Sequence, residues 1–217
     1  MISEKFSKKH FIIFGANTLD PISGKFFNSM LAVDNNFKII QSYNKRKLVP
    51  FGEFLPFESF LNNFGLKKIT EGHGSFLKGE KNKNLLIENL NILPLICYEV
   101  IFTDLIQKST KDTNMIINIS EDGWFGESIG PDQHFSKSVF RAIENDTFFL
   151  RSTNQGVSAI IDNKGNIIKQ LDWNEAGNIE FEVPLIKSNK IKNDLIFFIL
   201  LITYLFIFLI YKKKDAK

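Results

Sequence analysis

The sequence predicts an α+β domain followed by a single membrane-spanning helix, and three observations support this. Apolar runs of strand type alternate with stretches of helical spacing, as where residues 92–96 are followed by residues 100–106. The 217 residues are 44% hydrophobic, enough for one substantial core and one domain. Residues 195–211 form an uncharged apolar run near the C-terminus.

Composition excludes few functions. The formal charge is +3, from 27 basic and 24 acidic residues, which is too balanced to argue for nucleic-acid binding. The single cysteine excludes an intrachain disulfide, so the redox compartment cannot be inferred from disulfides. Residues 1–10 are charged and polar and lack the apolar segment of a signal peptide.

The N-terminal half reads as strands and loops. We expect strands at 11–15, 27–33 and 37–43, with turns at 20–24 and 34–36. Residues 43–56 contain Pro and Gly and are expected to form a rigid loop. The polar, glycine-containing segment 61–83 is typical of a lid or binding loop, and sometimes of disorder.

The second half alternates strands and helices. Strands are expected at 85–90 and 92–96, with a helix from Cys97 to about residue 111. A strand at 115–119 precedes a polar and aromatic segment and a helix at 132–146. Further strands are expected at 148–152, 157–161, 167–171 and 179–183, with a hairpin turn at 162–165.

The C-terminal run has the composition of a membrane span. As a helix, residues 195–211 would be about 25 Å long, near the lower limit for a bilayer. A buried core helix is the alternative, but one of this length normally shows a polar face, and here only Thr203 and two tyrosines are polar. We expect a linker at 187–194 and a basic cytoplasmic tail at 212–217. The domain at 1–186 would then lie outside the cytoplasm, although three lysines in residues 187–192 weaken the charge asymmetry.

Cys97 ends an apolar strand, a position that suits a nucleophile. A following helix N-terminus favours the thiolate, and a nearby lysine lowers the pKa of a thiol and stabilises an oxyanion. Lys45 also follows a strand and could reach the same rim. A lone cysteine in an apolar run is more often a packing residue, so the position alone does not decide.

Several ordered motifs together resemble one family. They are YNKRKLVPFGEFLP, ICYEV, NISEDGWFG, GPDQHF, RAIEN and RSTNQG. They are similar to the carbon–nitrogen hydrolase (nitrilase) family and, with the C-terminal span, to its bacterial apolipoprotein N-acyltransferase branch. The resemblance implies a nitrilase-type αββα sandwich at 1–186, incomplete at its N-terminus.

The resemblance also implies roles for individual residues. Cys97 would carry the acyl group as a thioester, Lys45 would stabilise the oxyanion, and Glu53 would orient the site. The residues expected to support the oxyanion are Tyr98 and Glu99, through a backbone N–H. The residues expected to line the substrate pocket are Trp124, Phe125, His134 and Asn154. No cofactor and no metal are expected.

The activity implied is transfer of a fatty acyl chain from a membrane phospholipid to the N-terminal amine of a diacylglyceryl-modified apolipoprotein. The location implied is the bacterial inner membrane, with the domain on the periplasmic face. A further expected partner is the missing N-terminal part of the same enzyme.

Two departures from the family pattern leave alternatives open. Glu121 stands where the family has Asn in its Ser-Asn-Asp segment. The family's general-base glutamate lies in a Trp-Pro-Glu motif, which these 217 residues do not contain. A membrane-tethered amidase acting on a small amide, and a non-catalytic fragment or partner subunit, therefore stay as competing interpretations.

Overall fold

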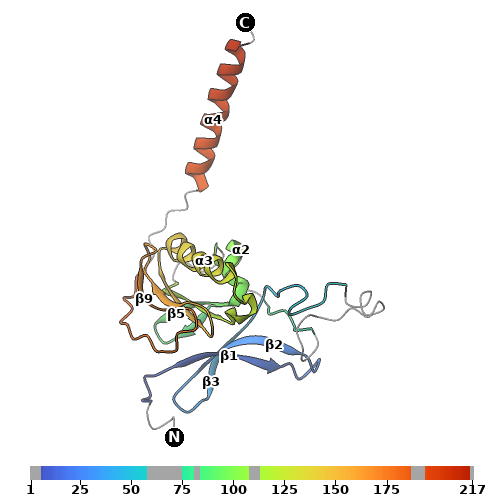
Figure 1. The fold of residues 1–217 in the computed structure, drawn as a ribbon, viewed down its shortest axis with the longest axis vertical. Helices are drawn as coiled ribbons and strands as arrows, with labels where there is room; N and C mark the ends of the chain where they lie inside the picture. The colour runs from blue at the N-terminus through green and yellow to red at the C-terminus, as the bar shows by residue number, and fades with distance from the viewer. Residues whose placement is uncertain (1–5, 58–74, 81–83, 108–112, 187–193, 216–217) are drawn as a thin grey trace.

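The computed structural model describes residues 6–57, 75–80, 84–107, 113–186 and 194–215. It shows two β-sheets packed face to face, with helices against the outer face of the larger sheet (Figure 1). The smaller sheet is antiparallel and contains β1 (Ile12–Leu19), β2 (Phe26–Val33) and β3 (Ile39–Asn44), in that order. Two packed sheets with a helical layer agree with the α+β sandwich that the sequence predicts.

Within the described ranges, the larger sheet has six strands in chain order: β4 (Leu85–Ile87), β5 (Leu90–Ile96), β6 (Met115–Ser120), β7 (Phe148–Thr153), β8 (Ser158–Ile161) and β9 (Ile167–Leu171). Strands β5, β6 and β7 are parallel, and the outer pairs are antiparallel. Because parallel strands end at the same edge, the segments after β5, β6 and β7 meet there.

Side chains alternate between two cores. Ile116 on β6 belongs to the core beneath the helices, whereas Met115 and Ile117 belong to the core between the sheets. The helical layer consists of α2 (Thr103–Gln107) and α3 (Gly130–Asn145). Pro131 lies in the first turn of α3, where its missing N–H costs no hydrogen bond. Among the described residues, no helix covers the outer face of the β1–β3 sheet (Figure 1).

Two expected elements differ in the structure. Residues 179–183 form no strand, so that prediction is wrong. The Phe181 ring packs against Phe148, and Val183 packs against the core between the sheets. The alternation of apolar residues therefore reflects separate side-chain contacts rather than a ladder of hydrogen bonds between strands. The helix after Cys97 is a five-residue 3₁₀ helix, η2 (Cys97–Ile101), followed by the five-residue α2. Residues 108–112, and most of the expected loop at 61–83, lie outside the described residues.

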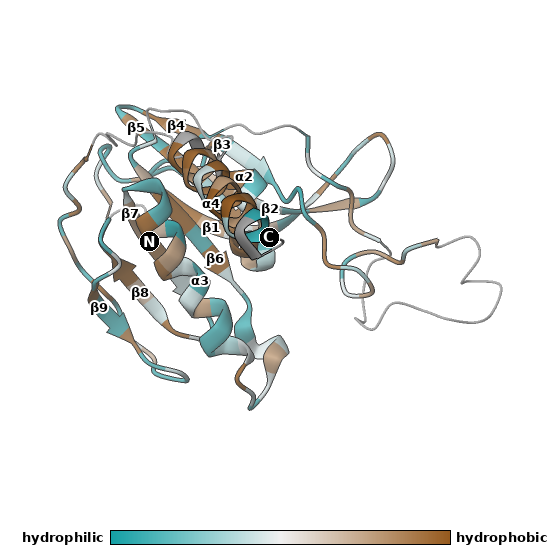
Figure 2. Cartoon of the chain, turned by 90° about the horizontal axis from the view of Figure 1, so that it is seen from above, coloured by the Kyte–Doolittle hydropathy of each residue, from teal (hydrophilic) through white to brown (hydrophobic). Residues whose placement is uncertain are grey.

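The last element, α4 (Asp194–Asp215), is apolar on every side. Residues 196–213 have a mean hydropathy of 2.1, and none of this stretch is buried by the rest of the chain. Figure 2 shows the helix as almost continuously hydrophobic. By length and composition, α4 can cross a membrane.

Candidate active site

Cys97 occupies a strained turn at the end of β5. Its φ is +51°, in the left-handed region that residues with a Cβ rarely adopt. Such strain persists only where the surrounding structure imposes it, and it concentrates at functional sites. The half-buried Cys97 side chain packs against the core between the sheets. Its carbonyl lies near groups of the helix-covered side, Asn118 and His134.

Glu99 joins this turn to the loop that follows β3. Its carboxylate is fully buried and accepts hydrogen bonds from the Tyr43 hydroxyl (2.9 Å) and the Ile96 N–H (2.9 Å). It also accepts from the N–H groups of Arg46 (2.7 Å) and Lys47 (3.1 Å). Burial raises the pKa of Glu99, while the backbone donors and the Lys45 charge oppose that rise. The Lys45 segment is thereby fixed against the Cys97 turn.

Burial also raises the pKa of the Tyr43 phenol, and the neighbouring Glu99 carboxylate adds to the effect. Tyr43 is therefore a neutral donor to Glu99 at physiological pH, and its hydroxyl holds the carboxylate from the side of the smaller sheet.

Lys45 and Glu53 form a buried ion pair. Lys45 is 1% exposed, and its Nζ lies 2.8 Å from Glu53 Oε1. Glu53 also accepts from the Asn28 amide (2.9 Å) and the Val49 N–H (2.9 Å). The backbone beyond Lys45 is held by the Gly79 N–H, which donates to the Lys45 carbonyl at 2.8 Å. A Cβ at Gly79 would lie 2.1 Å from the Asn44 carbonyl oxygen, so only glycine permits this approach.

A second buried polar cluster lies on the opposite side of Cys97. Asp122 and Arg151 form an ion pair (2.6 Å), and neither side chain is exposed. Asp122 also contacts the Nδ1 atom of His134 (3.0 Å) and accepts from Ser120 Oγ (2.6 Å). Burial alone raises the pKa of Asp122, but the His134 hydrogen bond and the Arg151 charge outweigh it and lower the pKa to about 2.

Arg151 completes this cluster by binding Asn118, its neighbour in register on β6. Burial lowers the pKa of Arg151, while the charges of Asp122 and Cys97 oppose that change. Asn118 donates in turn to the carbonyls of Leu95 (3.1 Å) and Cys97 (3.4 Å). The cluster therefore reaches the backbone of the candidate nucleophile.

Aromatic side chains lie above this cluster. The His134 ring centroid is 5.3 Å from that of Phe125 and 6.0 Å from that of Tyr98. Tyr98 is 37% exposed and Trp124 is 62% exposed, so both are accessible from solvent. Their place in a substrate pocket stays a prediction, as does that of the buried His134.

Asn154 and Glu121 organise the turn η3 (Asp122–Phe125). The Asn154 amide oxygen accepts from the Asp122 N–H at 3.1 Å. Glu121, the residue that departs from the family pattern, accepts from the Gly123 N–H at 3.2 Å and caps η3. The substitution therefore keeps a capping acceptor in this turn.

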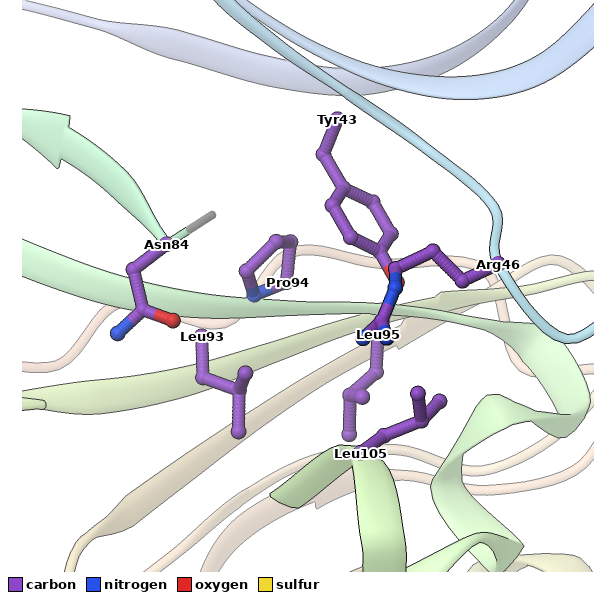
Figure 3. Close-up of a pocket in the computed structure, with 7 residues that line it drawn as sticks. All are labelled: Tyr43, Arg46, Asn84, Leu93, Pro94, Leu95 and Leu105. Atoms are coloured by element: carbon purple, nitrogen blue, oxygen red, sulfur yellow. The ribbon is translucent and has the colours of Figure 1, made fainter. Parts of the chain in front are cut away.

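A shallow pocket lies beside β5, lined by Tyr43, Arg46, Asn84, Leu93, Pro94, Leu95 and Leu105 (Figure 3). Figure 3 shows Tyr43 and Arg46 reaching over β5 from the loop side. Cys97 is not part of its lining, and it is too small to hold a substrate. Within the described residues, no cluster of three or more His, Cys, Asp or Glu side chains could hold a metal ion.

The structure therefore places the loop of Lys45 and Glu53 against the turn of Cys97 and Glu99. Sequence reasoning missed the roles of Tyr43, Asn28, Asp122 and Arg151. The available signal for Arg151 and Asn118 was a polar residue inside an otherwise apolar strand, because such a group must find buried partners. Asn28 lies in a strand of mixed polarity, where no such signal stands out.

Known proteins resemble this chain in sequence. Residues 6–192 match the carbon–nitrogen hydrolase family. The chain is 41% identical over 160 residues to an apolipoprotein N-acyltransferase of Rhizobium leguminosarum bv. trifolii, covering 73% of this chain and 30% of that protein. A protein of the same name from Rhodopseudomonas palustris is 40% identical over 159 residues, with the same coverage. The chain thus spans about 30% of the length of these curated relatives.

Solved structures resemble it in fold. The Saccharomyces cerevisiae protein Nit3, a member of branch 10 of the nitrilase superfamily, superposes with a TM-score of 0.58 at 20% identity. The match covers 78% of this chain and 59% of Nit3. Fold, motifs and sequence match agree: the chain belongs to the carbon–nitrogen hydrolase family.

Proposed function

We propose that this chain is the catalytic portion of an apolipoprotein N-acyltransferase. It moves a fatty acyl chain from a phospholipid, through a thioester on Cys97, to the N-terminal amine of a diacylglyceryl-modified apolipoprotein. The observation that carries the proposal is the strained Cys97 turn held against the buried Lys45–Glu53 pair, in a chain about 40% identical to proteins of that name.

In the first half-reaction, the Cys97 sulfur attacks the ester carbonyl of the phospholipid. The carbonyl oxygen becomes an oxyanion, which the Lys45 ammonium and the Tyr98 N–H stabilise. Collapse of this intermediate breaks the ester C–O bond and leaves the acyl group on sulfur. The proton lost by the thiol passes through a general base to the departing lysophospholipid alkoxide.

In the second half-reaction, the apolipoprotein amine attacks the thioester carbonyl. The same donors stabilise the second oxyanion, and collapse forms the amide and releases the Cys97 thiol. The amine must lose a proton as it attacks, which requires a base. Glu53 is committed to Lys45, Asn28 and the Val49 N–H, so its role here is to hold the lysine.

We place the general base in a polypeptide outside these 217 residues, which contain no Trp-Pro-Glu motif. The coverage of the relatives, about 30% of their length, supports a missing N-terminal part as partner. Among the described residues β1 is the edge strand of its sheet, which supports this partner too, because an edge strand can pair with further polypeptide.

We also propose that α4 anchors the domain in the bacterial inner membrane, with the domain on the periplasmic face. The lysines at 212–214 would then lie on the cytoplasmic side. This arrangement gives the site access to acyl chains of membrane phospholipids and to the lipid-modified end of an apolipoprotein.

The test is a chimera in which the upstream portion of the Rhizobium leguminosarum relative is fused to this chain. With phospholipid carrying a labelled acyl chain, intact mass spectrometry should detect a thioester adduct, and a diacylglyceryl lipopeptide should then receive the label. Cys97→Ala should abolish both. An adduct that persists in Cys97→Ala, or hydrolysis of small amides without acyl transfer, would refute the proposal.

A further inference from the structure

We propose that His134 is a positioning residue for Cys97: its ring holds the Cys97 carbonyl and so sets the direction of the adjoining peptide. The proposal rests on Cys97 being the reactive thiol of the proposed function. It gives a role to the buried Asp122–His134–Arg151 cluster, which the proposed reaction steps do not use.

The contact is direct. His134 lies on α3, is 3% exposed, and its Nε2 is 3.3 Å from the Cys97 carbonyl oxygen. The Asn118 amide reaches the same oxygen from β6 at 3.4 Å. Two side chains from different elements thus converge on one main-chain carbonyl at the residue with the strained φ.

The orientation of this carbonyl matters because of peptide geometry. In the planar trans peptide that links Cys97 to Tyr98, the C=O and the N–H point to opposite sides. A carbonyl held toward α3 therefore directs the Tyr98 N–H away from α3, toward the side on which the Cys97 side chain packs. An oxyanion formed at the sulfur would meet its backbone donor there.

The other edge of the His134 ring is fixed by ions. Its Nδ1 lies 3.0 Å from Asp122 Oδ1 and 3.0 Å from Arg151 Nη2. The Nε2–H tautomer donates to the Cys97 carbonyl and accepts from Arg151, and the protonated ring donates to both Cys97 and Asp122. In both states Nε2 carries the proton that the Cys97 carbonyl accepts.

Packing alone does not explain the cluster. A buried ion pair can often be replaced by apolar side chains of similar volume with little loss of stability. Here the buried ions Asp122 and Arg151 are arranged around the imidazole, and the imidazole faces the Cys97 carbonyl. The directional contact, rather than the buried volume, is what this set of residues provides.

The sole cysteine makes the proposal testable at one atom. Cysteine labelled with ¹³C at its carbonyl carbon places a single label in the full chain, at Cys97, and infrared spectroscopy in detergent micelles then reports the hydrogen bonding of that carbonyl. His134→Leu removes the donor, His134→Gln keeps an N–H of similar reach, and Ser138→Ala is the matched control. Ser138 is buried on α3 one turn from His134 and contacts Arg151 at 3.4 Å.

We expect the labelled band to move to higher frequency in His134→Leu, to return toward its original position in His134→Gln, and to stay in place in Ser138→Ala. An unshifted band in folded His134→Leu, or an equal shift in Ser138→Ala, would overturn the proposal.

A measurement on the unaltered protein covers the case in which His134→Leu fails to fold. Solid-state NMR should detect dipolar coupling between the labelled Cys97 carbonyl carbon and a ¹⁵N-labelled histidine ring, and that coupling should be lost in His134→Gln. Its absence from the unaltered chain would overturn the proposal. None of these measurements requires acyl transfer, so an inactive chimera with the expected band shifts would refute the proposed function alone.

Discussion

Glu53 and Glu99 show how one residue type serves two purposes near Cys97. Glu53 is 15% exposed at its side chain and pairs with the Lys45 ammonium. Glu99 is fully buried, and its carboxylate accepts hydrogen bonds from neutral donors, chiefly main-chain N–H groups. Glu53 therefore places a charge in the site, whereas Glu99 fixes the distance between two loops.

The lysine side chains of this loop should differ sharply when truncated. Lys45→Ala in the chimera should reduce acyl transfer by about 10²–10³-fold, the range for loss of one oxyanion donor. Lys47→Ala is the matched control, because its N–H to Glu99 remains and only a partly exposed ion pair with Asp104 and a contact with the Phe102 ring are lost. Initial rates of label transfer measure both effects. Equal losses of rate at the two positions would instead indicate a basic surface that binds phosphate.

Glu99→Gln should destabilise the loop rather than change the chemistry directly. A glutamine keeps one acceptor oxygen and places an NH₂ against donors such as the Ile96 N–H, at a cost of roughly 2–3 kcal/mol. The midpoint of chemical unfolding should fall, and Cys97 should become more accessible to iodoacetamide. An unchanged midpoint together with lost transfer would show that Glu99 acts in the reaction itself.

At this scale the sequence predicted part of the site. Cys97 and Lys45 each follow a predicted strand, Glu53 is implied by the family resemblance, and the structure brings the two loops together. Arg46 and Lys47, the cations that follow Lys45, are half-buried, and the Lys47 ammonium lies over the Phe102 ring, 5.1 Å from its centroid. Asn28 could not be found this way, because its partner Glu53 is 25 residues away and only the tertiary fold brings them together.

The elements themselves follow from the sequence where apolar runs are long. Strands β2, β6, β7 and β9 lie close to their predicted positions. The strand predicted at 179–183 fails because alternation of apolar residues fixes which side chains face inward, but not whether a partner strand offers backbone groups. The helix predicted after Cys97 is short because the left-handed Cys97 turn leads into a 3₁₀ segment.

The ion cluster that joins β6, β7 and α3 should make stability depend on pH in the acid range. The pKa of Asp122 is about 2 in the folded chain against an ordinary value of 3.8. A lowered folded pKa contributes stability above the unfolded pKa, and that contribution is lost as pH falls from about 4 to about 2. The contribution amounts to about 2 kcal/mol at neutral pH.

Asp122→Asn should therefore be less stable at pH 7 and should lose less stability on acidification. The free energy of unfolding measured between pH 7 and pH 2 checks this, with exposed Asp132→Asn as control. Parallel acid profiles for Asp122→Asn and the unaltered chain would contradict the assignment of this acid transition to Asp122.

At the scale of the whole molecule, a folded domain and an apolar helix must meet different solvents. The stretch 196–213 is not buried by the domain, so in water it would expose one continuous apolar surface. A bilayer removes the free-energy cost of exposing that surface to water.

A chain that lacks residues 194–217 should leave the membrane fraction and stay soluble. A chain that lacks only residues 212–217 should remain in the membrane fraction after an alkaline carbonate wash. Equal partition of the two would argue against α4 as the anchor.

The division of labour proposed for the reaction leads to a final prediction for the whole molecule. Residues 1–217 hold the thiol, the buried lysine and the strained turn, so iodoacetamide should label Cys97 in the isolated chain. Turnover requires more than a reactive thiol, because the acceptor amine must lose its proton to a positioned carboxylate. A general base of this kind raises the rate by about 10²–10⁴-fold. The isolated chain should therefore show no catalytic transfer of acyl groups to a lipopeptide.

Adding the upstream portion of a relative, fused or in trans, should restore transfer, and changing the Glu of its Trp-Pro-Glu motif to Gln should remove it again. Multiple turnovers by residues 1–217 alone would show that a group within this chain is the base.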